Sequence, residues 1–147
     1  MEQAFEIDPR IGDSFERQGF MRHLGAQLRH ARAGRCIIEA DFSEHLTQQH
    51  GYFHAGVSAT LADNAAGYAA YTLMPEGASV LTVEFKINLV NPARPGLMRA
   101  SAEVIKPGRT LSVVRAVVTT TADGTETPCA EFLGTVMTLL DRNGRTD

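Results

Sequence analysis

The stretch HGYFHAGVSATLADNAAGYAAYT, from His50 to Thr72, decides the fold. Between Ala55 and Tyr71 it carries one charged side chain, the carboxylate of Asp63, and every other residue is apolar, small or neutral. A helix that is apolar on nearly every side is normally surrounded by protein. The stretch therefore predicts one long buried helix that ends near Pro75. A single carboxylate, that of Asp63, is unexpected in such a helix and has to be explained by a partner or a function.

The segments on either side of this helix predict strands. Two runs with partial alternation, Ala26 to Ala31 and Arg35 to Phe42, read as a hairpin about Ala33-Gly34. After the helix, the stretch from Ala78 to Asn91 alternates with period two, which indicates a long strand. Its apolar residues are expected on one face and its polar residues on the other, as follows: Leu81, Val83, Phe85, Ile87 and Leu89 against Thr82, Glu84, Lys86 and Asn88.

Further elements complete the predicted architecture. Strands are expected at Leu97 to Ile105, Thr110 to Thr120 and Cys129 to Leu140, and a short helix at Asp13 to Leu24 with an apolar side of Phe15, Phe20, Met21 and Leu24. A flat sheet covers only one stripe of a helix, so the sheet must curl around the central one. The expected class is α+β, with an antiparallel sheet curled around one long helix.

Composition excludes several classes of protein. At 147 residues and 44% hydrophobic content, the chain suits a single domain, residues 1–147, with a core that needs no metal or disulfide. A net charge of -3 with scattered basic residues argues against nucleic acid and membrane surfaces as partners. No run reaches the roughly 18 apolar residues of a membrane span, no signal peptide is recognisable, and a cytoplasmic location is expected. Cys36 and Cys129 match no metal-ligand spacing and are expected as buried thiols.

One group of motifs resembles a known family. His54-Ala55-Gly56-Val57 followed by Leu61-Ala62-Asp63-Asn64 resembles the HGG-x(6)-D signature of hotdog-fold acyl-CoA thioesterases of the phenylacetate-degradation (PaaI) type. The similarity extends from about Gln48 to Leu140. Ala55 stands where the family usually has a second glycine, and Gln48 where it usually has an asparagine. The resemblance implies a hotdog fold, a coenzyme A thioester as substrate, no cofactor or metal, and active sites shared between two subunits of a homodimer or dimer of dimers.

Thioester hydrolysis needs a donor for the developing oxyanion and a carboxylate that attacks the carbonyl or activates water. Gly56 at the helix N-terminus is the expected amide donor, and Asp63 the expected carboxylate. Seven residues at about 1.5 Å each put them roughly 10 Å apart, too far for one reacting carbon. A two-fold dimer brings Gly56 of one subunit opposite Asp63 of the other.

Other residues are weaker candidates. His54 is expected to hold the loop that presents the Gly56 amide, Gln48 to replace the family asparagine, and Thr82 to help place the attacking water, although an ordinary polar strand face explains Thr82 equally well. His50 and Val57 are expected near the substrate. Lys106, Arg109 and Thr110 form a hairpin tip that suits the phosphates of coenzyme A, or a solvated turn.

Two alternatives stay open at this point. A hotdog dehydratase or hydratase on acyl thioesters needs His54 or His50 as its base. A non-catalytic acyl-CoA-binding member is compatible with the changed Ala55 and Gln48. The aromatic residues Tyr52, Phe53, Tyr68 and Tyr71, together with Met74, line an acyl pocket or pack in the core, and the sequence does not separate aryl from alkyl substrates.

Overall fold

A computed structural model describes residues 5–140. None of its helices is both long and apolar enough to cross a membrane. The elements follow in this order: α1 (Pro9–Glu16), α2 (Gly19–Leu24), β1 (Ala26–Arg32), β2 (Arg35–Asp41), a 3-10 turn (Glu44–Leu46), α3 (Ala55–Tyr71), β3 (Ala78–Leu89), β4 (Leu97–Lys106), β5 (Leu111–Ala122) and β6 (Thr125–Leu140).

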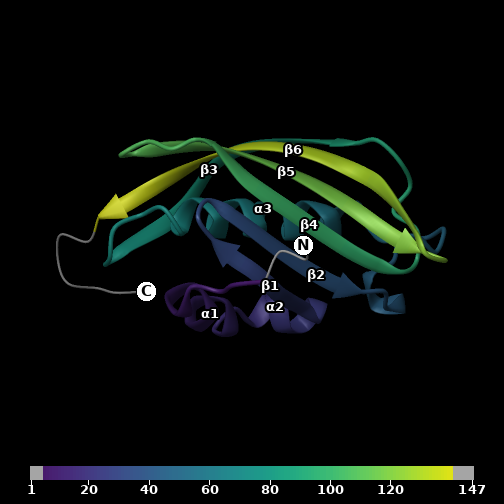
Figure 1. Ribbon diagram of the computed structural model, residues 1–147. Helices are drawn as coiled ribbons and strands as arrows, with labels where there is room; N and C mark the ends of the chain where they lie inside the picture. The colour runs from purple at the N-terminus through teal and green to yellow at the C-terminus, as the bar shows by residue number, and fades with distance from the viewer. Residues whose placement is uncertain (1–4, 141–147) are drawn as a thin grey trace.

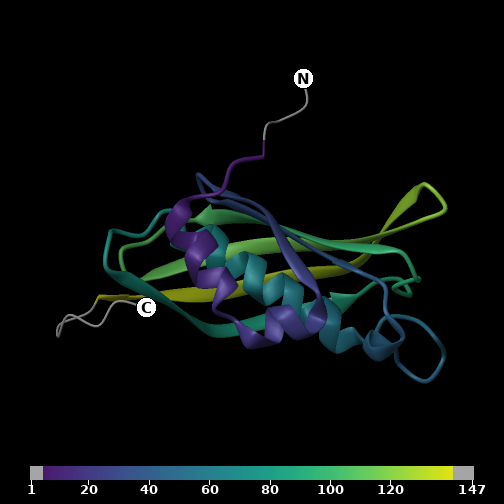
Figure 2. The ribbon, with the colours of Figure 1, turned by 90° about the horizontal axis from the view of Figure 1, so that it is seen from below.

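The six strands form one antiparallel sheet in the order β1-β2-β4-β5-β6-β3. Figure 1 shows this sheet curving over α3, with α1 and α2 below, and Figure 2 shows the two short helices lying along α3. The curved sheet around one central helix is the predicted α+β hotdog architecture, which is thereby confirmed.

The central helix is buried because small residues let the sheet approach it closely. Leu61, Ala62, Ala65, Ala66 and Ala69 have no exposed surface. Burial at about 25 cal/mol per Å² of apolar surface makes this helix and the inner sheet face the main source of stability. Both cysteines are buried and free, as the sequence predicts.

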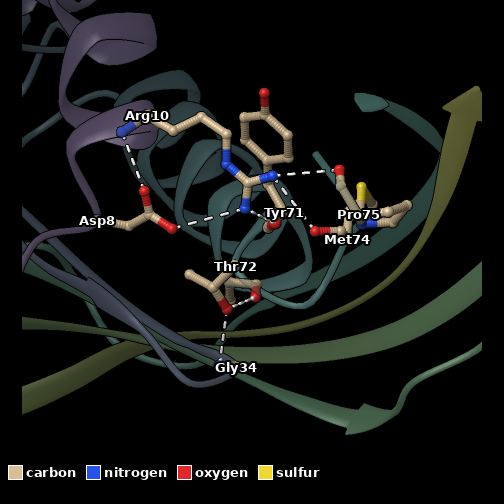
Figure 3. Close-up of polar contacts among 8 residues, drawn as sticks. Asp8, Arg10, Gly34, Tyr71, Thr72, Met74 and Pro75 are labelled. Carbon is tan, nitrogen blue, oxygen red and sulfur yellow. Dashed lines mark hydrogen bonds and ion pairs between the residues drawn. The ribbon is translucent and has the colours of Figure 1, made fainter. Parts of the chain in front are cut away.

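The carboxyl end of α3 is held by an arginine of α1 (Figure 3). The Arg10 guanidinium donates to the carbonyl oxygens of Tyr71, Met74 and Pro75 at 3.1 to 3.3 Å. It also lies 4.5 Å from the centre of the Tyr71 ring. The last turn of a helix leaves carbonyls without intrahelical partners, and a cation there is favourable for the helix dipole. This contact fixes the N-terminal helices against α3.

The single helix predicted at Asp13 to Leu24 is wrong. Two helices occupy this region, and α1 starts earlier, because Asp8 caps it and Pro9 occupies its first turn. Gln18 has an extended backbone (ψ 105°) that separates α1 from α2. The resulting change of direction leaves Phe20 56% exposed, although Phe15, Met21 and Leu24 are buried as predicted.

The two predicted faces of β3 are partly wrong because this strand contains a β-bulge. The pairing of β3 with β6 shifts between Thr82 and Glu84, so the side-chain alternation is broken at Val83. Thr82 points to α3, where it contacts Asp63, and Phe85 also faces inward, where it stacks on Phe132. Leu81 pairs with Met137 and Thr82 with the buried Val136, so these two alternate as predicted, but Thr82 does not share its face with Glu84, which contacts Thr135 on the exposed side.

The other strands lie near their predicted positions. Ala33-Gly34 and Asp123-Gly124 both have positive φ angles, which is typical of two-residue hairpin turns. β6 begins at Thr125, four residues before the predicted start at Cys129. The early start of β6 was not predicted because Pro128 has no N–H to donate to the neighbouring strand, which argues against a strand in the sequence. The structure accommodates Pro128 beside a shift in the pairing of β5 with β6.

Candidate functional site

Asp63 forms its one side-chain hydrogen bond in the described part of the chain with Thr82. The Thr82 hydroxyl donates to the Asp63 carboxylate at 2.7 Å. Burial raises the pKa of the Asp63 carboxyl above its ordinary value, and the Thr82 hydrogen bond lowers it in part. Asp63 also lines two cavities, of about 280 Å³ and about 260 Å³. It is therefore an accessible, half-buried carboxylate with raised basicity.

The accessible surface of α3 forms one stripe. Gly56 is exposed, and Ala59, Thr60, Asp63 and Asn64 are partly exposed, whereas the rest of the helix from Val57 onward is buried. Positions three and four apart lie on one helix face, so Gly56 and Asp63 look in the same direction two turns apart. At 1.5 Å per residue their separation is about 10 Å. One protomer does not bring the two expected catalytic groups together.

The Gly56 amide is occupied in the isolated chain. His54 is the N-cap of α3, and its Nδ1 accepts a hydrogen bond from the Gly56 N–H at 2.8 Å. Because Nδ1 uses its lone pair here, the neutral ring carries its proton on Nε2. His54 thus orders the helix start, and a substrate oxygen that takes the Gly56 N–H must replace the imidazole.

The remaining candidates near the helix start lie apart from Asp63. Gln48 accepts a hydrogen bond from the His50 backbone and lines a cavity of about 460 Å³ with Tyr52, Phe53, Ala55 and Ser58. His50 is exposed in the loop, and Val57 is buried and lines a cavity that also includes Gly56. These residues surround the amide end of the stripe.

The basic hairpin tip lies near the carboxylate end. Lys106, the last residue of β4, and Arg109 and Thr110 in the turn that follows it are all exposed. Leu111 pairs with Met137, which pairs with Leu81 beside Thr82, so the tip and Thr82 are at the same end of the sheet. Within residues 5–140, no group of three or more His, Cys, Asp or Glu side chains is placed to hold a metal ion.

Two polar residues of the N-terminal helices, Ser14 and Gln18, lie near Asp63 and were not predicted as site residues from the sequence. Gln18 exchanges hydrogen bonds with the Asn64 amide at 3.0 and 3.1 Å and donates to the Tyr68 hydroxyl at 2.6 Å. Ser14 lies 3.1 Å from the same hydroxyl. Asn64 lay inside the quoted motif, but nothing in the sequence indicated that Gln18 would reach it or that Ser14 would reach Tyr68.

The outer edge of β3 is open. β3 is the last strand of the sheet, and within the described residues no strand pairs with its free side. Large apolar side chains of β3 are exposed: Leu81 51%, Val83 50% and Leu89 57%. A long apolar edge strand is a template for pairing with another chain.

Comparison with known proteins finds a matching family and proteins of similar sequence and fold. A model of the thioesterase superfamily matches residues 50–127. The crystal structure of a thioesterase family protein from Silicibacter pomeroyi is 45% identical, with a TM-score of 0.88 over 90% of this chain and 97% of that one. Human acyl-coenzyme A thioesterase 13 is 33% identical over 109 residues, which are 73% of this chain and 77% of its own length. The E. coli PaaI protein from the phenylacetic acid degradation operon shares the fold at 20% identity, with a TM-score of 0.79 over 94% of each chain.

Proposed function

Because the chain belongs to the thioesterase superfamily, a family of thioester hydrolases, we propose that it hydrolyses acyl-CoA thioesters to a free acid and coenzyme A. The observation that carries this proposal is the pair formed by Asp63 and Thr82. A half-buried carboxylate with a raised pKa, held by one hydroxyl on an accessible stripe, suits a general base or a nucleophile. Similarity to human acyl-coenzyme A thioesterase 13 supports the coenzyme A thioester as the substrate class.

The active unit in this proposal is a two-fold homodimer. The open β3 edge, with its exposed apolar side chains, supplies the surface on which a second copy pairs. A two-fold axis across the α3 stripe puts Gly56 of each copy opposite Asp63 of the other and creates two equivalent sites. This arrangement removes the separation of about 10 Å that divides the two groups within one chain.

In the general-base route, the Asp63 carboxylate takes a proton from water while the water oxygen bonds to the thioester carbon. The carbonyl electron pair moves to oxygen, where the Gly56 N–H of the second copy stabilises it. The tetrahedral intermediate then collapses, the C–S bond breaks, and the sulfur takes the proton from Asp63. Thr82 holds the carboxylate in place throughout.

In the nucleophilic route, an Asp63 oxygen attacks the same carbon and expels the thiolate, and water then hydrolyses the resulting anhydride. Both routes use the same two groups. In both, the thioester oxygen replaces the His54 imidazole on the Gly56 amide, so His54 acts as a positioning residue. Lys106, Arg109 and Thr110 are proposed to contact the coenzyme A phosphates, because they are exposed at the sheet end that carries Thr82.

No observation favours the dehydratase alternative. Its base must be His54 or His50, but neither forms a side-chain hydrogen bond with Asp63 in the described residues, and the family that matches the chain is one of thioesterases.

The test is free-thiol release from a panel of acetyl-, hexanoyl-, decanoyl- and phenylacetyl-CoA by the purified protein. Asp63→Asn keeps the side-chain shape and removes the base, so turnover is expected to fall about 10² to 10⁴-fold. Asp13→Asn makes the same change on the exposed surface of α1 and serves as the matched control. Undiminished release by Asp63→Asn overturns the proposal.

A further inference from the structure

A cavity of about 340 Å³, here called the outer-face cavity, lies on the face of the sheet that points away from α3. Its lining comes from the segment before α1 and from β1, β2, β4 and β5. Arg35, Glu103 and Arg115 line it and are exposed, whereas a direct neighbour of each along its strand is buried. Asp63 and Gly56 belong to α3 on the inner face (Figure 1), so the outer-face cavity is separate from the candidate active site. Its volume lies in the usual range of about 300–1,000 Å³ for ligand pockets.

One side of the outer-face cavity is apolar and aromatic. Ile37 and Val117 line it and are half-buried. The Phe5 and His30 rings also line it, with their centroids 6.5 Å apart. Phe5 is 63% exposed, so a bound ring removes further apolar surface from water, which is favourable by about 25 cal/mol per Å². This side therefore suits a flat apolar group.

The segment that carries Phe5 is held against β1, beside the hairpin of β1 and β2 (Figure 2). Ile7 forms a parallel bridge with Ala31, and the Ala31 N–H donates to the Glu6 carbonyl oxygen at 2.9 Å. The Glu6 N–H donates to Nδ1 of His30 at 3.2 Å. These contacts place the aromatic wall of the cavity through the backbone of the chain.

The other side of the outer-face cavity carries charges of both signs. In the pairing of β2, β4 and β5, Glu103 lies directly between Arg35 and Arg115. Opposite charges at such cross-strand positions normally attract each other. In the part of the chain that the structure describes, however, neither Arg35 nor Glu103 forms an ion pair, and Arg115 pairs with Glu131 at 3.2 Å instead. A guanidinium and a carboxylate therefore stand side by side with their charges open to a ligand.

This pair of open charges selects the class of ligand. An anion that reaches Arg35 also meets the carboxylate of Glu103, and a cation that reaches Glu103 also meets Arg35 and Arg115. A molecule that carries both charges a few atoms apart satisfies both residues through charge-assisted hydrogen bonds. The ammonium and carboxylate groups of an α-amino acid are joined through one carbon atom, and its side chain leaves from the same atom.

We infer that the outer-face cavity binds a free α-amino acid with an aromatic side chain. Its ammonium group lies at Glu103, its carboxylate at Arg35, and its ring against Phe5. Such binding is independent of thioester hydrolysis and goes beyond the proposed function, because the cavity and Asp63 lie on opposite faces of the sheet.

The experiment uses L-tryptophan as the probe, because the chain contains no tryptophan and adds no indole signal of its own. The protein is titrated into L-tryptophan, and the fluorescence anisotropy of the indole is followed. Saturable binding to one site per chain is expected, with a Kd of about 1 mM or lower. N-acetyl-L-tryptophan lacks the positive charge and tryptamine lacks the carboxylate, so each is expected to bind about tenfold more weakly.

Two variants assign the binding to the outer-face cavity. Arg35→Met and Glu103→Gln each remove one charge while keeping the size of the side chain. Because both residues are exposed, each change is expected to raise the Kd for L-tryptophan by about three- to tenfold and to leave the melting temperature unchanged. Arg17→Met and Glu16→Gln make the same changes on the exposed surface at the end of α1 and are expected to bind as the wild type does.

An anisotropy that does not saturate up to about 10 mM protein or competing L-phenylalanine overturns the inference. Equal affinity for L-tryptophan and its two singly charged analogues contradicts a zwitterion site, as does a loss of binding in only one of the two variants. Binding that survives both variants places the ligand elsewhere. Thiol release is not part of this test, so either result leaves the proposed function standing, and a failure of Asp63→Asn to lower turnover leaves the outer-face cavity untouched.

Discussion

Thr82→Val isolates the contribution of one hydroxyl to the reactivity of Asp63. Valine has nearly the same shape as threonine, but it cannot donate the 2.7 Å hydrogen bond to the carboxylate. This hydrogen bond favours the ionised form, and its loss makes deprotonation of Asp63 harder. Below the pH at which Asp63 ionises, the rate is proportional to the fraction of ionised carboxylate.

The size of the effect follows from the contact. A hydrogen bond to a charged group contributes about 1.5–3 kcal/mol, and Asp63 is only partly buried, so the lower end of this range applies. Since 1.4 kcal/mol corresponds to about a factor of ten, kcat/KM on the acidic limb is expected to fall about tenfold. The acidic limb moves toward alkaline pH because the pKa of Asp63 rises further.

The assay is the pH profile of kcat/KM for thiol release. Thr135→Val is the matched control, because the Thr135 hydroxyl also donates to a carboxylate, that of Glu84, but on the exposed outer face. Its profile is expected to coincide with that of the wild type. An active Thr82→Val enzyme with an unmoved acidic limb refutes the reasoning that Asp63 titrates in this limb.

Three further variants test other contacts. Arg10→Met removes the donor to three carbonyls at the end of α3 and is expected to lower the free energy of unfolding by about 2 kcal/mol in urea denaturation, whereas Arg17→Met on the exposed surface changes it little. His54→Ala removes the N-cap of α3 and is expected to cost about 1 kcal/mol, which His54→Asn should restore because asparagine is a good cap; equal melting temperatures for the two variants contradict this role. Val83→Asp puts a charge on the open β3 edge and is expected to yield an inactive monomer in light scattering, whereas an active dimer argues against pairing through β3.

Much of the fold could be predicted from the sequence because two signals were unusually clear. The run from Ala55 to Tyr71, with Asp63 as its one charge, required a sheet on several sides, and turn sequences such as Asp123-Gly124 indicated the hairpins, where both residues have positive φ. The break at Gln18 and the bulge at Val83 could not be predicted, because both depend on packing against α3 and on pairing with β6 rather than on local propensity.

Some residues of the candidate site could likewise be predicted from the sequence, and others could not. Asp63 was evident as the lone charge of a buried helix, and Thr82 was a candidate from its position in β3. Gln18 could not be predicted as a site residue, since its contact with Asn64 spans 46 residues of sequence. It also lies at the break between α1 and α2, in a region that the sequence pattern predicted as one continuous helix. His54 was expected to hold the loop that presents the Gly56 amide, but its direct hydrogen bond with that amide was not predicted, because a motif gives the residue types and not the contact between them.

The central claim, that each active site joins Asp63 of one copy to Gly56 of another, is tested most directly by complementation. Asp63→Asn and Gly56→Pro, which removes the amide donor in the first turn of α3, are each expected to be inactive as homodimers. Random mixing makes about half of the dimers hybrid, each with one intact site, so activity should return to about a quarter of the wild-type value per chain. Hybrid dimers that form, as shown by native mass spectrometry, and yet release no thiol would contradict the account.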